Sequence, residues 1–330
     1  MANDKMIAVI CDGYGEPEVL KIERVAKPIP KSNEILIRII ATSVNSGDVL
    51  VRSLKVDLFV KIIMRLKFGW NKPRNPILGT VYSGIIEQVG KDVKEFNVGD
   101  EVFGLRGFSF GTYAEYVSVK ENSVISKKPV NASFEEAAAI LFGGQTAYYF
   151  LSQTKISKIP MLNILVYGAT SAVGTSALQI AKSYDANVTA VCSDYNEALV
   201  LKLGADRTIF YNKVDFTRSL EKYDVIFDAV GMISRKQCSH MLKHNGTYLT
   251  VNGLDYAREA RAQINFIKEL FEKGNYDATI DKTFYLNEIV DAHRYVETGR
   301  KKGNVILKIS EYHEHQPLTR VLIFKSNIRK

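Results

Sequence analysis

The sequence predicts an α/β protein in which a doubly wound parallel sheet follows a smaller domain of short β-strands. Within residues 163–182, an apolar strand runs through a turn of small residues directly into a helix. Strands and helices then alternate as far as residue 228, which is typical of a parallel sheet. Before them, residues 6–124 contain short strand-like runs between glycine turns. A chain of 330 residues suits two such domains.

The first 124 residues are predicted to form a small barrel-like β domain. Their apolar runs are short, and glycines lie between or within them. The runs are residues 35–40, 84–90, 97–104 and 111–117. Closely spaced turns between short strands favour a closed or nearly closed β-sheet over a helical domain.

Residues 54–70 differ from the rest of this domain because they combine apolar and basic side chains without strand alternation. Leu54, Leu58, Ile62 and Leu66 recur every four residues, which predicts an amphipathic surface or lid helix. Its charged residues and its length are unsuited to a membrane span. Peripheral contact with a membrane remains the minor alternative.

A helix is predicted to connect the two domains. Ser133 with Glu136 three residues later has the pattern of a capping box, which marks a helix start. Residues 137–139 are alanines, and the small-residue segment 143–147 follows on the same helix.

The turn at residues 168–174, Gly-Ala-Thr-Ser-Ala-Val-Gly, is the most informative segment of the chain. Small side chains let the backbone approach a ligand closely, and the unpaired N–H groups of the helix start favour an anion. The turn therefore predicts a site for a dinucleotide pyrophosphate, although Ala169 and Ser171 replace two glycines of the usual fingerprint. The alternative is a tight turn in an ordinary α/β core.

Further strands favour the dinucleotide interpretation over an ordinary core. The predicted strands are residues 187–192, 208–210 and 224–228, with a helix through Leu203 and a break at 204–206. An ordered series of this kind is what a doubly wound sheet requires.

Composition indicates an ordinary globular protein, with 46% hydrophobic and 24% charged residues. The net charge of +8 comes from 44 Lys and Arg against 36 Asp and Glu, but the basic residues are scattered. We therefore predict solvated surface and no nucleic-acid partner.

Cysteine usage and the N-terminal sequence give two further expectations. Cys11, Cys192 and Cys238 lie far apart, so they predict neither a disulfide framework nor a four-thiolate zinc site. Residues 1–10 contain an acidic residue, Asp4, and pass straight into a strand-like run, without the pattern of a signal peptide. We expect a cytoplasmic protein.

Several motifs in a fixed order together resemble a known family. They are Ala-x-Ser-Val-Asn-x-x-Asp at 41–48, the glycine-spaced run 79–90, Val-Gly-Asp-x-Val at 98–102, Gly-Thr-Tyr-Ala-Glu-Tyr at 111–116, Gly-x-Thr-Ala at 144–147, the turn at 168–174, Leu-Gly-Ala-Asp at 203–206 and Phe-Asp-Ala-Val-Gly at 227–231. Over roughly residues 6–309 the chain resembles the medium-chain dehydrogenase/reductase superfamily, and within it the zinc-free, zeta-crystallin-like quinone oxidoreductases.

The resemblance implies a domain organisation. A GroES-like catalytic β domain would comprise residues 1–124 and be completed by 284–310, around a Rossmann domain at 125–283. The tail at 311–330 lies beyond the resemblance and has no assigned role.

The resemblance also implies a zinc-free site. Zinc-dependent relatives place a cysteine near position 43 and a His-Glu pair just after the glycine at 79, where this chain has Ser43, Thr80 and Val81. Without a Lewis acid, hydride transfer needs an acceptor that is already electron-poor. Quinones and α,β-unsaturated carbonyls meet this condition, so the expected partner is a small electrophilic acceptor.

Two residues are candidate catalytic donors. The resemblance puts Asn45 beside the nicotinamide, where its amide could donate a hydrogen bond to the acceptor oxygen. Tyr82 is either a second donor or an aromatic side chain packed inside the β domain. Asp48 either takes part or, as we favour, caps a turn and holds Asn45 in place.

The resemblance assigns a set of residues to the cofactor. Those expected to line its cleft are Thr146, Gly168, Ala169, Ser171, Ala172, Val173, Gly174, Ser193, Tyr211, Val230, Gly231, Asn252 and Asn304. Ser193 leaves room for a 2′-phosphate, and Tyr211 with Lys213 resembles the phosphate-side pair of NADPH users. Asn196 and Asp194 favour NADH instead. Several relatives carry a lysine at the position of Asn196, and an inward Asp194 would repel the 2′-phosphate. The sequence favours NADPH over NADH.

The resulting hypothesis is a reductase of quinones or enones that uses NAD(P)H without zinc and forms a homodimer. The alternative is a non-catalytic NADPH-binding sensor or scaffold. The two replaced glycines and the lack of a clear proton donor motivate this alternative.

Overall fold

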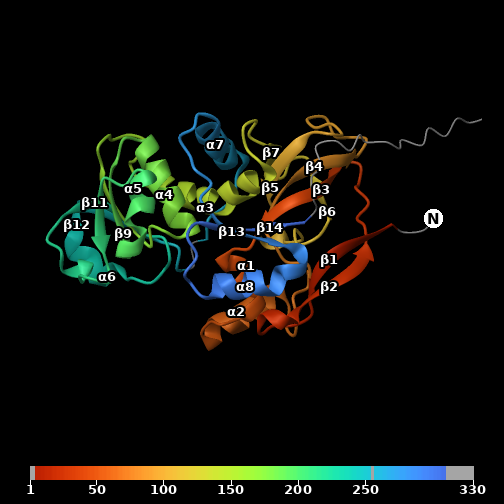
Figure 1. The fold of residues 1–330 in the computed structure, drawn as a ribbon, viewed down its shortest axis with the longest axis horizontal. Helices are drawn as coiled ribbons and strands as arrows, with labels where there is room; N and C mark the ends of the chain where they lie inside the picture. Colours follow the sequence, from red (N-terminus) through yellow and green to blue (C-terminus); the bar gives the residue numbers. More distant parts are fainter. Residues whose placement is uncertain (1–3, 254–255, 310–330) are drawn as a thin grey trace, which may run out of the picture.

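The computed structural model describes residues 4–253 and 256–309. The predicted tail at 311–330 lies outside the described residues. Figure 1 shows two lobes with helix α3 between them. One lobe contains the first part of the chain together with its late elements β13, β14 and α8, and the other contains the middle part.

The bounds of the β-strands and α-helices are as follows. The strands are β1 (Lys5–Cys11), β2 (Leu20–Ala26), β3 (Glu34–Ser43), β4 (Val81–Val89), β5 (Glu101–Leu105), β6 (Tyr116–Lys120), β7 (Ile125–Lys127), β8 (Asn163–Tyr167), β9 (Asn187–Cys192), β10 (Arg207–Phe210), β11 (Tyr223–Asp228), β12 (Leu242–Thr250), β13 (Ile280–Tyr285) and β14 (Asn304–Lys308). The α-helices are α1 (Ser46–Ser53), α2 (Leu58–Phe68), α3 (Phe134–Ser152), α4 (Ala172–Ser183), α5 (Glu197–Lys202), α6 (Arg235–Cys238), α7 (Arg261–Glu272) and α8 (Ile289–Glu297).

The α/β domain is built on a parallel sheet in the order β10-β9-β8-β11-β12. Its central strands are apolar on both faces, and Leu165 and Val166 of β8 are both fully buried. Helices cover both faces of such a sheet, so alternation of polar and apolar residues is not required. Because the strands are parallel, their carboxyl ends meet at one edge of the sheet. The predicted doubly wound fold is confirmed.

The β domain is built on a second sheet in the order β13-β14-β3-β4-β5-β7, with β6 also paired to β3. Alternate residues of β3, namely Ile35, Ile37 and Ile39, enter one buried cluster because successive side chains of a strand point to opposite faces. The chain returns to this sheet late, and β14 pairs antiparallel with β3. The β1–β2 hairpin pairs separately and is bridged to the domain between Ala8 and Ala114.

Helix α3 connects the two domains. The predicted capping box is confirmed: the Ser133 hydroxyl accepts from the Glu136 N–H at 3.1 Å, and the Glu136 carboxylate accepts from the Ser133 N–H at 2.8 Å. Gly143 allows a close approach to α4, because a Cβ at this position would lie 2.2 Å from the Ala172 carbonyl oxygen. The start of α4 is therefore held directly against the connecting helix.

The predicted surface helix within residues 54–70 forms as α2, but its apolar stripe points outward. Leu54 is buried just before the helix, whereas Leu58, Ile62 and Leu66 are exposed. Met64 is the buried residue of the inner face. No helix among residues 4–253 and 256–309 is long and apolar enough to cross a membrane.

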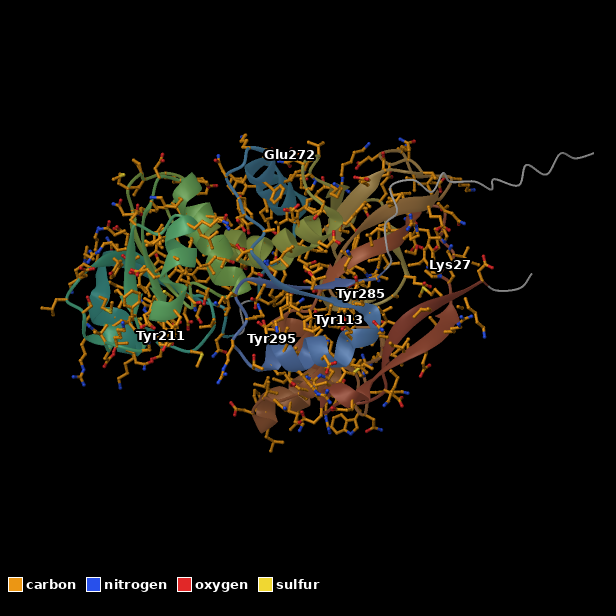
Figure 2. The ribbon with its side chains drawn as sticks, in the orientation of Figure 1. Lys27, Tyr113, Tyr211, Glu272, Tyr285 and Tyr295 are labelled. Atoms are coloured by element: carbon orange, nitrogen blue, oxygen red, sulfur yellow. The ribbon has the colours of Figure 1, made fainter. Side chains whose placement is uncertain are left out.

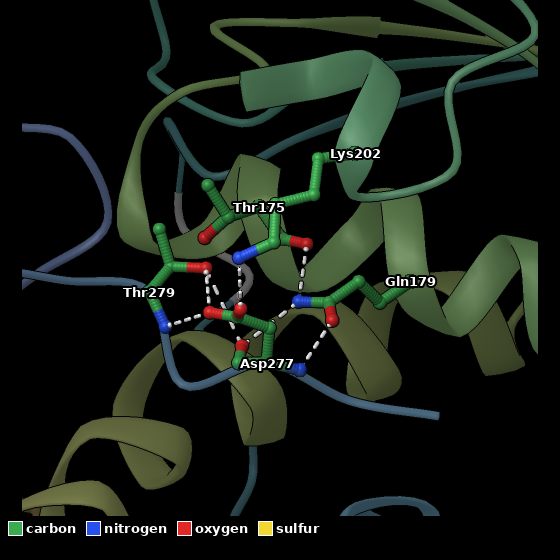
Figure 3. A network of polar contacts seen from close by, with 5 residues as sticks. All are labelled: Thr175, Gln179, Lys202, Asp277 and Thr279. Atoms are coloured by element: carbon green, nitrogen blue, oxygen red, sulfur yellow. Dashed lines mark hydrogen bonds and ion pairs between the residues drawn. The ribbon is translucent and has the colours of Figure 1, made fainter. Parts of the chain in front are cut away.

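A polar network holds α4 against residues 277–279, the segment just before β13 (Figure 3). The side chain of Gln179 donates to the Asp277 carbonyl at 3.1 Å and accepts from the Asp277 N–H at 2.6 Å. The Asp277 carboxylate binds Lys202 of α5 at 2.8 Å and accepts from the Thr279 N–H at 2.7 Å. The network joins two helices of the α/β domain to the strand β13 that follows.

Candidate cofactor cleft and acceptor site

The predicted turn lies between β8 and α4, at the carboxyl edge of the parallel sheet. Gly168 has a φ of 72°, a backbone conformation that favours glycine, and a Cβ there would lie 2.6 Å from a methyl carbon of Val230. Gly174 is equally constrained, since its Cβ would lie 2.2 Å from the Gly168 carbonyl oxygen. These two glycines keep the turn tight, while Ala169, which replaces a glycine of the usual fingerprint, is fully buried.

The start of α4 presents hydrogen-bond donors at this turn. Ser171 caps the helix, because its hydroxyl accepts from the Gly174 N–H at 2.9 Å. Ala172 and Val173 are the first two helical residues, so their N–H groups have no acceptor within the helix. Two free N–H groups at the positive end of a helix dipole fit one end of a diphosphate.

Two further strand ends bring predicted residues to the same edge. The buried Asp228 carboxylate at the end of β11 accepts from the N–H groups of Val230 and Gly231 at 3.2 and 2.8 Å. Asn252, just after β12, donates from its side chain to the Gly231 carbonyl at 3.1 Å. The Val230 side chain lies directly beside Gly168, so the loops after β8, β11 and β12 lie together around the turn.

The segment before β14 also reaches the turn. Gly303 forms a β-bridge with Ser171, and its N–H donates to the Thr170 carbonyl at 2.8 Å. Asn304 is buried, and its side-chain amide donates to the Ala278 carbonyl at 2.8 Å, so this amide is already engaged. Thr146 is buried on α3, the helix that packs against the start of α4.

The predicted adenosine end lies where β9 ends. The Asp194 carboxylate pairs with Lys213 at 2.9 Å, and this partner lowers the pKa of the carboxyl. The Asn196 amide donates to the Ser193 hydroxyl at 2.9 Å. Tyr211 is half exposed, and Figure 2 places it in the α/β domain. The structure thus brings together Ser193 with both the favourable Lys213 and the unfavourable Asp194.

Asn45 lies in the β domain as the N-cap of α1. Its side-chain oxygen accepts from the Asp48 N–H at 3.1 Å, and its own N–H donates to the Asp48 carboxylate at 3.3 Å. The preferred interpretation of Asp48 as a cap is therefore confirmed. The Asn45 amide donates to the Thr80 hydroxyl at 2.8 Å. Asn45 thus positions a second polar group, and the sequence did not single out that hydroxyl as a donor.

Tyr82 lies inside the β domain. Its side chain is fully buried in the cluster of Ile35, Ile37 and Ile39, and burial raises the pKa of its phenol well above the usual range. A Cβ on Gly104 would lie 2.4 Å from the Tyr82 hydroxyl oxygen. Of the two interpretations given for Tyr82, an aromatic packed inside the domain is the one that fits this burial.

Asp48 belongs to a buried polar cluster. Tyr113 donates to its carboxylate at 2.9 Å, and burial raises the pKa of Asp48 to about 7. The Tyr113 ring packs edge-on against His293, 5.8 Å between centroids, and burial lowers the pKa of His293 to about 3. Arg52, also buried, pairs with Glu297 at 2.6 Å. The cluster joins α1 to α8, the late helix of the same domain.

Glu259 is a titratable group that sequence reasoning missed. Burial raises the pKa of its carboxyl to about 7, partly offset by a hydrogen bond from the Gly107 N–H. The Arg106 N–H, next to Gly107, donates to the Thr80 carbonyl at 2.7 Å, so Glu259 contacts the β-domain loop that pairs with the backbone of Thr80. Glu259 follows β12 in a segment without strand or helix periodicity, so no sequence pattern indicates its role.

The described residues contain no group of three or more His, Cys, Asp or Glu side chains that could hold a metal ion. At the positions occupied by zinc ligands in zinc-dependent relatives, Ser43 is buried and Thr80 is half-buried.

Comparison with protein families assigns both domains. The family described as alcohol dehydrogenase GroES-like domain matches residues 31–129. Families described as zinc-binding dehydrogenase match residues 172–273 and 252–307. The GroES-like domain of the predicted fold class is therefore confirmed.

Similar proteins cover most of the chain. A 2-methylene-furan-3-one reductase of Solanum lycopersicum is 32% identical over 89% of this chain and 76% of its own length. An NADPH-dependent alkenal/one oxidoreductase of Arabidopsis thaliana chloroplasts is 30% identical over 92% and 79%. The structure of the quinone oxidoreductase from Coxiella burnetii superposes with a TM-score of 0.79, at 25% identity, over 93% of this chain and 100% of the other. The chain therefore belongs to the medium-chain dehydrogenase/reductase superfamily, in its quinone oxidoreductase and alkenal/one reductase branch.

Proposed function

We propose that the protein is a zinc-independent NADPH-dependent reductase of quinones or α,β-unsaturated carbonyls. The observation that carries the proposal is the Thr80 hydroxyl, held by the Asn45 amide at 2.8 Å. It lies where zinc-dependent relatives have a metal ligand. Relatives named for alkenal/one and methylene-furanone reduction support this acceptor class.

The chain's own residues bind and orient the reactants. The N–H groups of Ala172 and Val173, with the tight turn at Gly168 and Gly174, suit the diphosphate of the cofactor. When bound, NADPH supplies a hydride to the electron-poor carbon of the acceptor. Asn45 occupies a lone pair of the Thr80 oxygen, which leaves the Thr80 O–H to donate to the acceptor oxygen as negative charge develops on it.

The preference for NADPH rests on Lys213. A 2′-phosphate beside Ser193 would meet the Asp194 carboxylate, but Lys213 already neutralises that carboxylate at 2.9 Å. The ammonium of Lys213 can then contact both groups. Ser193 leaves the space that a longer acidic side chain would fill.

The test is turnover of NADPH with a panel of small quinones and conjugated enones, with and without a chelator. We expect oxidation of NADPH that a chelator leaves unchanged. Thr80→Val removes the donor and should lower kcat by about a hundredfold. Thr80→Ser keeps a hydroxyl and should retain most activity, which separates donation from packing.

Two results would contradict the proposal. Tight NADPH binding without oxidation on any acceptor would favour the non-catalytic sensor or scaffold. Equal activity of the Val and Ser variants would remove Thr80 from the mechanism.

A further inference from the structure

Helix α2 presents an unusually apolar face to solvent. The side chains of Leu58 and Phe59 are each 74% exposed, and Leu66 is 61% exposed. Together with Ile62, Ile63 and Trp70, which are about half exposed, they form what we call the α2 patch. Exposed apolar residues in one contiguous group mark a binding surface more often than scattered ones do.

The patch covers one side of the helix. Leu58, Ile62 and Leu66 follow one another at intervals of four residues, so they lie along one stripe of the helix, with Phe59 and Ile63 beside it. Trp70 follows just after the end of the helix. Met64 is buried on the opposite face, and Phe68, one turn later, contacts Phe108 and Phe110 at 5.6 and 5.7 Å between ring centroids. The inner face of α2 therefore packs on the domain, and the stripe does not.

Several contacts fix the helix in this orientation. The Tyr14 hydroxyl donates to the Gly69 carbonyl at 2.8 Å, and the Arg74 guanidinium donates to the Leu66 carbonyl at 3.1 Å. In Figure 1, α2 lies at the lower edge of the molecule, below α8. The helix that carries the outward stripe is therefore held in place by hydrogen bonds at its C-terminal end.

The surroundings of the patch are basic. Lys61, Arg65 and Lys67 lie on α2 itself, with Lys72 and Arg74 just beyond, and no acidic residue occurs between Asp57 and Glu87. Asp57 is the N-cap of α2, and Lys72 pairs with Asp12 at 3.1 Å. Long basic side chains beside an apolar stripe can reach lipid phosphates while the stripe enters the acyl region.

A separate group of aromatic rings lies on the Phe68 side of α2, toward the α/β domain. Phe108 and Tyr256 are each about half exposed and contact each other at 5.4 Å between centroids. The Lys67 ammonium lies 3.5 Å from the Phe108 ring centroid. Aromatic rings beside cations are typical of the membrane interface, where one end of a side chain is apolar and the other is solvated.

We propose that α2 docks the protein onto the surface of an anionic lipid bilayer, lying in the interface plane. A helix of 11 residues is too short to span a bilayer but long enough to lie on it. A second copy of the chain suits the patch less well, because two such faces would bring their basic borders together.

The test uses the full chain and vesicle co-flotation. Vesicles of phosphatidylcholine with phosphatidylglycerol are compared with vesicles of phosphatidylcholine alone, at low salt and at about 0.5 M salt. We expect binding to the anionic vesicles at low salt and weaker binding at high salt or without anionic lipid.

Matched variants separate the patch from general hydrophobicity. Phe59→Ser with Leu66→Ser should weaken vesicle binding by about tenfold or more. Ile29→Ser with Leu220→Ser removes side chains that are 79% and 89% exposed elsewhere, and it should leave binding unchanged. Lys61→Gln should weaken binding to anionic vesicles by about fivefold without reducing apolar area.

Three outcomes would overturn the proposal. The first is no binding to anionic vesicles at low salt. The second is equal loss in both double variants. The third is a dimer in sedimentation that the Phe59→Ser, Leu66→Ser variant dissociates, with no vesicle binding by either form, which would assign the patch to a second copy.

Discussion

Asp48 and His293 are two buried titratable groups whose effects on stability have opposite signs. Burial raises the pKa of Asp48 to about 7, above its unfolded value, so the native state binds more protons here and stability falls as pH rises through that window. Burial and the Arg52 charge lower the pKa of His293 to about 3, so stability rises with pH up to about 6.5. Between about pH 4 and 6.5 the two groups therefore change the free energy of unfolding in opposite directions as pH rises.

Replacing Asp48 should separate the two effects. Asp48→Asn keeps an oxygen for the Tyr113 hydroxyl but removes the titration. Relative to the native chain, the variant should gain up to about 1.4 kcal/mol per pH unit between about pH 4 and 7. Urea unfolding across this range measures the difference. Parallel curves for the two proteins would show that Asp48 does not titrate there.

Lys213 should decide cofactor preference. Lys213→Gln removes the ammonium that pairs with Asp194 at 2.9 Å, so a 2′-phosphate would face an unbalanced carboxylate. The dissociation constant for NADPH should rise about tenfold, and that for NADH should change little. Titration calorimetry with both cofactors measures this, with the exposed Lys236→Gln as control. An equal change for both cofactors would place the 2′-phosphate elsewhere.

The spacing of Asn45 and Asp48 was enough to predict their relation, because an N-cap and the residue three positions later are neighbours in every helix start. Thr80 lies 35 residues further on and reaches Asn45 only through strand pairing in the β domain. Tyr82 shows the same limit: strand alternation does not say which face of a strand meets the cleft.

At the scale of elements, α3 and α4 have matching serine caps but different surroundings. Ser133 caps α3 together with Glu136, and Ser171 caps α4 beside the predicted diphosphate turn. A cap fixes the direction of the first N–H groups of its helix. Only the α4 cap should therefore influence cofactor binding.

Two alanine variants test this difference. Ser171→Ala and Ser133→Ala should each lower the free energy of unfolding by about 1 kcal/mol, because each leaves one N–H without its acceptor. Ser171→Ala should also weaken NADPH binding, while Ser133→Ala should not. Denaturant unfolding and a binding titration on the same samples measure both quantities. Equal binding by the two variants would contradict the assignment of the turn.

Helix α2 shows what periodicity leaves open. A repeat of four residues predicts a helix with an apolar side, and α2 has one. Whether that side is inside or outside depends on which surface is already filled. Here Met64 and Phe68 fill the inner contact, so the longer apolar stripe remains outside.

At the scale of the whole molecule, Arg261 connects the two domains. It begins α7, pairs with Glu95 at 2.6 Å and donates to the Ser123 carbonyl of the β domain at 3.3 Å. Its guanidinium also donates to the Glu121 carbonyl at 2.5 Å. These contacts hold the segment that contains Glu259 against the β domain.

Arg261→Ala should loosen this connection. Loss of the donors leaves partly buried carbonyls unpaired, so the free energy of unfolding should fall by about 1 to 2 kcal/mol. Because the proposed cleft lies between the domains, kcat/KM should also fall. Arg300→Ala, at an exposed arginine, serves as the control in denaturant unfolding and steady-state assays. Unchanged stability would show that the contact contributes nothing in solution.

The sequence by itself determined the fold class, the tight turn before α4 and the Ser133 cap of α3, because these depend on residues close together in the chain whose periodicity and spacing have local physical causes. Tertiary structure decided which hydroxyl Asn45 holds, where Asp194 turns, where Glu259 lies and which way α2 faces. These depend on contacts between segments far apart in the sequence, such as Asn45 with Thr80 and Glu259 with Gly107. Burial and pairing across such distances are set by packing of the whole chain, which no local pattern records.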